Sequence, residues 1–257
     1  MKSIFTLLFI SLVITSAFSQ TPVDVVTGGS YANEVYYNFN NDVLKTVPRN
    51  SWDIAFKTNQ MSVSVLANNG AGVMVYTWSK GAINNWETVD TTGMVRKPMF
   101  NSIVDWELGA FNANTVPGNA FDYGWGTYST NTHIISGDSI FIIQLASGNF
   151  KKFAINQKNP NLNKNTWTFR YADLNGQNDT TITLKANDYK TKSFVHFSLA
   201  NDAVVDHEPS EKWQLLFTRY YDYNIPYYVT GVLSNTGVKV QQVRGVSQSD
   251  FVDYQTS

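Results

Sequence analysis

The chain contains no cysteine and few charged residues, and each of these shortages excludes a class of protein. Without cysteine there is no disulfide framework, no thiol chemistry and no cysteine to carry a lipid anchor. Only 15% of the 257 residues are charged, the formal net charge is −1, and no basic run occurs. The sequence therefore offers no electrostatic footprint for nucleic acid or for an anionic membrane surface.

Long hydrophobic runs are also scarce. The one marked run, residues 4–14, follows an early lysine and precedes the small residues Ala17 and Ser19, which is the pattern of a signal peptide. No later segment reaches the roughly 18 uncharged residues that a membrane helix needs. We therefore predict a cleaved signal peptide over residues 1–20 and a mature protein that is secreted or held at the cell surface, without a membrane span.

Catalytic motifs are missing as well. The sequence has no G-x-S-x-G, no Walker loop and no H-E-x-x-H. Its only imidazoles are those of His133, His196 and His207, and they form no recognisable triad pattern. We predict that the protein is not an enzyme.

Aromatic residues are abundant, at 14% of the total, and many lie in short alternating segments. A period of two is typical of half-buried strands, and no segment sustains the 3.6-residue period of a helix. We predict an all-β, antiparallel fold with strands over 34–39, 51–56, 61–66, 73–78, 139–145, 150–155 and 165–171. Trp52 and Phe56, four residues apart, should share one face of their strand.

Two further segments have a characteristic local pattern. Asn68-Asn69-Gly70 predicts a tight hairpin turn between the segments 61–66 and 73–78, because Asn-Gly accepts the positive φ angles of primed turns. Residues 81–126 carry widely spaced aromatics among Asn, Gly, Pro and Thr, and indicate long loops with short strands.

The later part of the chain repeats features of the earlier part. The matches occur in the same order at an offset of roughly 160 residues, which favours a tandem duplication. They pair Tyr31 with Tyr189, Phe39 with Phe197, Trp52 with Trp213, Phe56 with Phe217, and Gly72-Val73 with Gly237-Val238. We predict one complete β domain over residues 21–179 and an incomplete second unit over residues 180–257.

Two stretches resemble a known family. The segments 50–56 (NSWDIAF) and 137–153 (GDSIFIIQLASGNFKKF) are similar to the stretches that open and close the HmuY-like domain, found in secreted haem-binding proteins of Gram-negative bacteria. The resemblance covers about residues 34–171 and the front of the second unit. It implies a β-rich domain that grips one haem between loops and hairpins, for haem and iron acquisition, without catalysis.

The resemblance also implies where haem would bind. In the family two side chains hold the iron, and the ligands come from the region between Trp86 and the closing hairpin. Met94, Met99 and His133 are the candidates there, since thioether and imidazole both ligate haem iron. The candidate pocket aromatics are Trp86, Trp106, Tyr123, Trp125 and Tyr128. Beyond haem iron we predict no metal; the expected partner is haem or another hydrophobic small ligand, with host haem proteins or glycans as further partners.

A carbohydrate-binding module or surface adhesin is the alternative, on the same fold with the haem site lost. Flat aromatics beside amides and acids suit sugars, and the same five aromatics would then act as stacking platforms. Their hydrogen-bonding partners would be Asp105, Glu107, Asn112, Asn114 and Asp122. A purely structural role is also open, because methionines and large aromatics commonly fill cores.

Overall fold

The computed structural model describes residues 22–240 and residue 245. The predicted signal peptide and the last residues of the predicted second unit lie outside them. The prediction of an all-β, antiparallel fold is confirmed, because every strand pair is antiparallel and the helices described are short 3-10 turns. These turns are η1 (Gly29–Tyr31), η2 (Arg49–Ser51), η3 (Asn69–Ala71), η4 (Ile83–Thr88), η5 (Ala110–Asn112) and η6 (Ala186–Tyr189). Within residues 22–240 and 245, no helix has the length and apolar character to cross a membrane.

The strands form three sheets, here named A, B and C. Sheet A has the order β15 (Tyr227–Ser234), β14 (Leu215–Asp222), β1 (Asn33–Asn38), β2 (Asp42–Pro48). Sheet B has the order β13 (Ala203–Val205), β12 (Phe194–Ser198), β3 (Ile54–Lys57), β4 (Val65–Ala67). Sheet C contains β11 (Thr180–Lys185), β10 (Thr166–Asp173), β9 (Phe150–Asn159), β7 (Ile135–Gly137) and β6 (Gly126–Tyr128), with β8 (Phe141–Gln144) pairing both β9 and β5 (Met74–Thr77).

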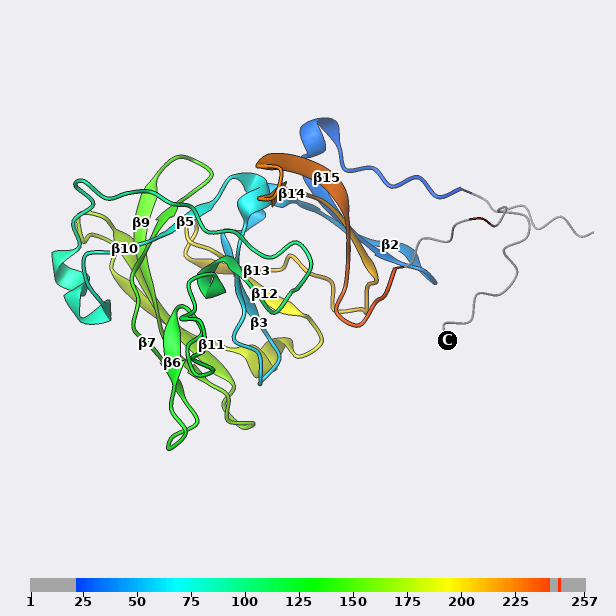
Figure 1. Ribbon diagram of the computed structural model, residues 1–257. Helices are drawn as coiled ribbons and strands as arrows, with labels where there is room; N and C mark the ends of the chain where they lie inside the picture. Colours follow the sequence, from blue (N-terminus) through cyan, green and yellow to red (C-terminus); the bar gives the residue numbers. More distant parts are fainter. Residues whose placement is uncertain (1–21, 241–244, 246–257) are drawn as a thin grey trace, which may run out of the picture.

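Sheet B is the middle of three layers, with sheet C on one side and sheet A on the other (Figure 1). Toward sheet C it presents Ile54, Phe56 and Phe197, which join the largest core cluster; Phe56 stacks on Phe169 of β10 with ring centroids 4.7 Å apart. Toward sheet A it presents Ala55 and other residues of a separate cluster. Every residue of β3 and of β12 is buried, as expected for strands covered on both faces.

Trp52 does not share a face with Phe56, so that prediction is wrong. Trp52 lies before β3 begins and packs with Ala55 on the side of sheet A, whereas Phe56 packs toward sheet C. The chain bends at Asp53, and this bend breaks the alternation that the four-residue spacing assumes. Trp213 shows the same behaviour in front of β14, where it packs with Leu216 rather than with Phe217.

Strands from the two predicted units share the sheets. β1 pairs with β14 in sheet A, β3 pairs with β12 in sheet B, and the predicted boundary after residue 179 lies in the turn between the paired strands β10 and β11. The segments 21–179 and 180–257 therefore do not build separate sheets over the residues described.

Sheets A and B repeat one pattern of hydrogen bonds. The Asp53 amide donates to the carbonyl of Phe197 at 2.9 Å, and the Gln214 amide donates to that of Tyr37 at 2.9 Å. In sheet B, Asn68 Nδ2 donates to the carbonyl of Trp52 at 2.9 Å. In sheet A, Asn235 Nδ2 donates to the carbonyl of Trp213 at 2.9 Å. The chain just before β3 and just before β14, where each tryptophan lies, is thus fixed by one strand partner and one asparagine.

The predicted hairpin at Asn68-Asn69-Gly70 is wrong. β4 pairs with β3 and β5 pairs with β8, so this turn carries the chain from sheet B to sheet C. Asn68 Oδ1 accepts from the Ala71 amide at 3.1 Å, and Asn69 Nδ2 donates to the carbonyl of Val73 at 2.9 Å. These side-chain bonds satisfy the turn locally, so that it forms without a hairpin ladder.

Gly70 is required by close packing, which gives a test of this arrangement. A Cβ at Gly70 would lie 1.9 Å from the carbonyl oxygen of Arg219 in β14, whereas a Cβ at Gly29 meets nothing within 4 Å. We expect Gly70→Ala to lower the free energy of unfolding by about 1 to 3 kcal/mol, as overpacking does, and Gly29→Ala to leave it nearly unchanged. Urea unfolding of both variants measures the difference, and equal stabilities would contradict the η3–β14 contact.

Candidate functional site

The three predicted haem ligands lie apart. Met94 packs against the cluster on the outer face of sheet C, with Trp78 and Trp86. Met99, which is 6% exposed, belongs to the core cluster between sheets B and C and bridges to Val75. His133 is exposed beyond β6, where its Nδ1 lies 2.6 Å from the hydroxyl of Tyr128. No two of them share a cluster.

The predicted pocket aromatics are similarly dispersed. Trp86 is buried and contacts two cations, with Lys152 Nζ 4.7 Å and the Arg170 guanidinium 4.8 Å from its ring centroid. Trp125 is fully buried in the main core, while Tyr123 and Tyr128 pack against that core in partly exposed positions. Of the five, Trp106 alone lines the cavity that the structure shows between sheets A and B.

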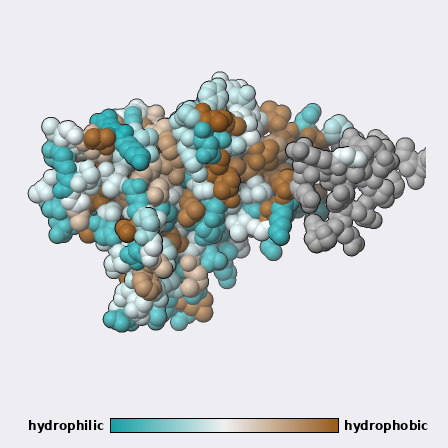
Figure 2. All heavy atoms as spheres, viewed as in Figure 1, coloured by the Kyte–Doolittle hydropathy of each residue, from teal (hydrophilic) through white to brown (hydrophobic). Residues whose placement is uncertain are grey.

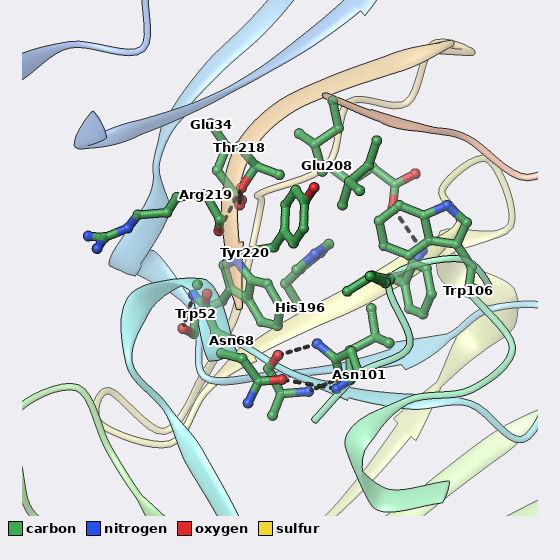
Figure 3. A pocket seen from close by; sticks show the side chains of 18 of the residues that line it. Glu34, Trp52, Asn68, Asn101, Trp106, His196, Glu208, Thr218, Arg219 and Tyr220 are labelled. Atoms are coloured by element: carbon green, nitrogen blue, oxygen red, sulfur yellow. Dashed lines mark hydrogen bonds between the residues drawn. The ribbon is translucent and has the colours of Figure 1, made fainter. Parts of the chain in front are cut away.

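That cavity, here called the inter-sheet cavity, has a volume of about 80 Å³. Figure 3 shows its side chains converging from both sheets and from the segment 101–106. Its walls are mainly aromatic and aliphatic: Tyr36, Trp52, Leu66, Trp106, Phe194, Trp213, Leu216 and Leu233. The rings meet edge to face, as between Tyr36 and Trp213 with centroids 5.2 Å apart.

Residues 101–106 close the inter-sheet cavity by attaching to both sheets. Asn101 Oδ1 accepts from the Ala67 amide of β4 at 3.0 Å, and its Nδ2 donates to the carbonyl of the same residue. Trp106 Nε1 donates to the carbonyl of Ser234 at the end of β15 at 2.7 Å. The segment is therefore anchored on sheet B at one end and on sheet A at the other.

Two buried glutamates face the inter-sheet cavity, and both have donors. Glu208 accepts from the amides of Ser193 and Phe194 and from Trp213 Nε1, each at 2.8 Å. Glu34 accepts from the Thr218 hydroxyl and pairs with His207 Nε2. Burial of these carboxylates is tolerated because each has several hydrogen-bond donors.

His207 links Glu34 to Ser51. Its Nδ1 lies 2.9 Å from the Ser51 hydroxyl, which gives a serine, a histidine and a glutamate in one hydrogen-bonded chain. Neither Ser51 nor His207 lines the inter-sheet cavity. The chain of bonds thus ties η2 to β1 and to the residues after β13, rather than pointing a nucleophile into a pocket.

His196 contributes a neutral imidazole to the cavity wall. It is buried in β12, and its ring lies edge-on to Trp52 with centroids 4.8 Å apart. Burial, reinforced by His207, Lys192 and Lys45, holds the pKa of His196 well below its usual range. The ring is therefore uncharged at neutral pH.

A wider, open groove of about 810 Å³ lies next to the segment 101–106 and shares Ser102 with the inter-sheet cavity. It is lined chiefly by Val95, Leu108, Gly109 and residues 97–100 and 112–115, together with Thr77 and Tyr223. Met99 is part of its wall: the Sδ accepts from the Thr77 hydroxyl at 3.3 Å and from Asn114 Nδ2 at 3.1 Å. Thr77 and Asn114 also line the groove, so the Met99 sulfur is bonded to two residues of its wall.

Apolar side chains also gather on the outside of sheet A, as Figure 2 shows on the visible face. Phe39, Val43 and Val232 are exposed there, around the turn of β1 and β2 and along β15. These residues lie apart from the groove and from the inter-sheet cavity.

Sequence reasoning missed the inter-sheet cavity. Its polar residues come from both halves of the chain, Glu34 from β1 and His196 and Glu208 from β12 and the segment after β13, and strand pairing between the halves brings them to one cavity. The recurrence of Trp52 as Trp213 was the sequence signal that could have indicated the cavity. The expectation that Trp52 shares a strand face with Phe56 assigned these tryptophans to the core instead. No family model, curated protein or solved structure matches this chain.

The depressed pKa of His196 predicts how stability depends on pH. Between its folded pKa and about 6.5, the unfolded chain binds a proton that the folded protein does not, so stability falls as the pH drops through this window. We expect His196→Phe to lose less stability than the parent between pH 7 and 5, by up to about 1.4 kcal/mol per pH unit. Urea unfolding at several pH values measures the slopes, and identical slopes would contradict a neutral, buried His196.

Proposed function

We propose that this protein is an exported, non-catalytic binding protein that carries a flat, largely apolar ligand of the haem class in the open groove. The observation that carries the proposal is Met99, because it is the predicted iron ligand that lines a groove of ligand-binding size. The volume of about 810 Å³ is within the range of roughly 300 to 1,000 Å³ that small-molecule sites occupy.

The walls of the groove suit such a ligand. Pro98, Phe100 and Leu108 supply apolar surface for a macrocycle, and Lys97 supplies a cation for an acidic substituent. To ligate iron, the Met99 thioether would exchange its contacts with Thr77 and Asn114 for one bond to the metal. The resemblance of residues 50–56 and 137–153 to the HmuY-like family supports the same ligand class and an exported location.

A matched pair of methionine variants tests the proposal. Met99→Leu removes the candidate ligand, while Met94→Leu removes a methionine on the outer face of sheet C; such volume-conserving changes cost less than about 1.5 kcal/mol. In a haemin titration we expect a shifted Soret band for the parent and for Met94→Leu, and its loss for Met99→Leu. A parent without a shift, or a Met99→Leu variant that keeps it, contradicts haem ligation in the groove.

Carbohydrate binding is a second candidate, favoured by the groove's polar side. The exposed Asn114 and the nearby Thr115 offer amide and hydroxyl groups beside the rings of Phe100 and Tyr223. Trp86 and Trp125 are buried, so the rings that stack on a sugar would be those of Phe100 and Tyr223. A glycan array on the same protein distinguishes the two: binding that Asn114→Ala abolishes, with no Soret shift, favours sugar over haem.

We also infer that the scaffold arose from two copies of one four-stranded unit, β1 to β4 and β12 to β15. The equivalent asparagine bonds to the Trp52 and Trp213 carbonyls support this duplication. So does the mirrored strand order, in which the first two strands of each copy pair with the last two of the other. In this arrangement both copies contribute strands to the same two sheets instead of forming two successive domains.

A further inference from the structure

One tryptophan differs from all the others in its hydrogen bonding. The chain has seven tryptophans, all within the described residues. Six donate from Nε1 to a protein acceptor: Trp78, Trp86, Trp106, Trp125, Trp167 and Trp213. Trp52 Nε1 is buried without a partner. A buried donor left unpaired costs about 1 to 3 kcal/mol, so an acceptor is expected beside it.

Trp52 lies in the wall of the inter-sheet cavity, and the residue is only 8% exposed. Two other polar side chains in the same wall, the Tyr36 hydroxyl and the His196 imidazole, also make no hydrogen bond within the part of the chain described. Figure 3 shows Trp52 and His196 on the same side of this space, opposite Trp106. The buried, unpaired Trp52 Nε1 and two further polar groups thus border one aromatic cavity.

The charges around the cavity restrict what can pair with them. Glu34 and Glu208 both line it, so an anion would meet two carboxylates. Arg219 also lines it, but its guanidinium lies 4.5 Å from the ring of Tyr228, and its side chain extends away from the space in Figure 3. A cation without an acceptor atom would leave the Trp52 N–H unpaired. An uncharged molecule with an acceptor oxygen meets both conditions.

The volume of the cavity limits the size of the ligand. Its volume of about 80 Å³ exceeds the roughly 10 to 15 Å³ that one water needs, and is below the roughly 150 Å³ of an engineered cavity that takes benzene. The ligand, or the part of it that enters, is therefore smaller than a six-membered aromatic ring. Leu66, Leu216 and Leu233 would contact its apolar side.

We propose that the inter-sheet cavity is a second binding site, separate from the groove, for a small uncharged molecule with a short apolar frame and one carbonyl or hydroxyl oxygen that accepts from Trp52 Nε1. The site is built by strands of both halves of the chain and closed by residues 101–106. It needs no iron and no methionine, so it stands independently of haem binding in the groove.

Three probes of similar size and different charge test this site on the full chain: butan-2-one, butyrate and butylammonium. The readout is the set of indole N–H signals in a nitrogen-15 correlation spectrum, one per tryptophan. We expect butan-2-one to shift the Trp52 signal saturably in the millimolar range, which suits a ligand of five non-hydrogen atoms. Butyrate and butylammonium should leave that signal in place.

Two variants separate ligand binding from packing. Trp52→Phe removes the donor but keeps an aromatic ring, and should weaken butan-2-one binding about fivefold to tenfold, followed through the Trp106 and Trp213 signals. Trp78→Phe, in the cluster on the outer face of sheet C, should leave binding unchanged. If no probe moves the Trp52 signal and its N–H only exchanges with water, the proposal is overturned. Equal binding of butan-2-one by the parent and by Trp52→Phe also overturns it.

Discussion

The pairing of β1 with β14 and of β3 with β12 is the constraint on which the rest of the structure depends. Each pair joins a strand from early in the chain to one that follows about 140 to 180 residues later. Without β12, one side of β3 would lack its ladder, and without β14 the same would hold for β1. Unpaired backbone groups at these central positions would be costly to bury, so neither sheet A nor sheet B is complete without both halves of the chain.

This exchange of strands also explains why the cavity exists where it does. Sheet B is covered by sheet C through close aromatic packing, as between Phe56 and Phe169. On its other side, the tryptophans that precede β3 and β14 reach into the space between sheets A and B. Their indole rings, with Trp106 of the closing segment, form part of the cavity wall. One face of sheet B is thus packed against sheet C, and the other borders the inter-sheet cavity.

The sequence predicts the fold class well, because alternation of apolar residues is a local property that survives in strands such as β10, expected over 165–171 and found at Thr166–Asp173. Strand partners are not local, and this is where prediction failed. Asn68-Asn69-Gly70 has the composition of a hairpin turn, but the pairing of β5 with β8 and the close approach of Gly70 to β14 decide its actual role. The bend at Asp53 likewise turned Trp52 away from the expected face.

The same distinction applies to the candidate sites. Residues 81–126 were expected to be loosely structured and to carry function, and their segment 95–115 does form most of the groove that includes Met99. The inter-sheet cavity depends on Glu34, His196 and Glu208, which no motif or spacing connects. Glu34 lines the same cavity as His196 and Glu208 only because the strand pairing crosses the midpoint of the chain.

The central claim is that the two halves of the chain form one cooperative unit around this cavity, and native-state hydrogen exchange on the full chain tests it most directly. The Asp53 amide donates to Phe197 and the Gln214 amide donates to Tyr37, so each is protected by the opposite half. We expect both amides to exchange only through global unfolding, at the free energy that urea unfolding gives. Exchange of either amide through a lower-energy opening that leaves sheet C protected would contradict the account.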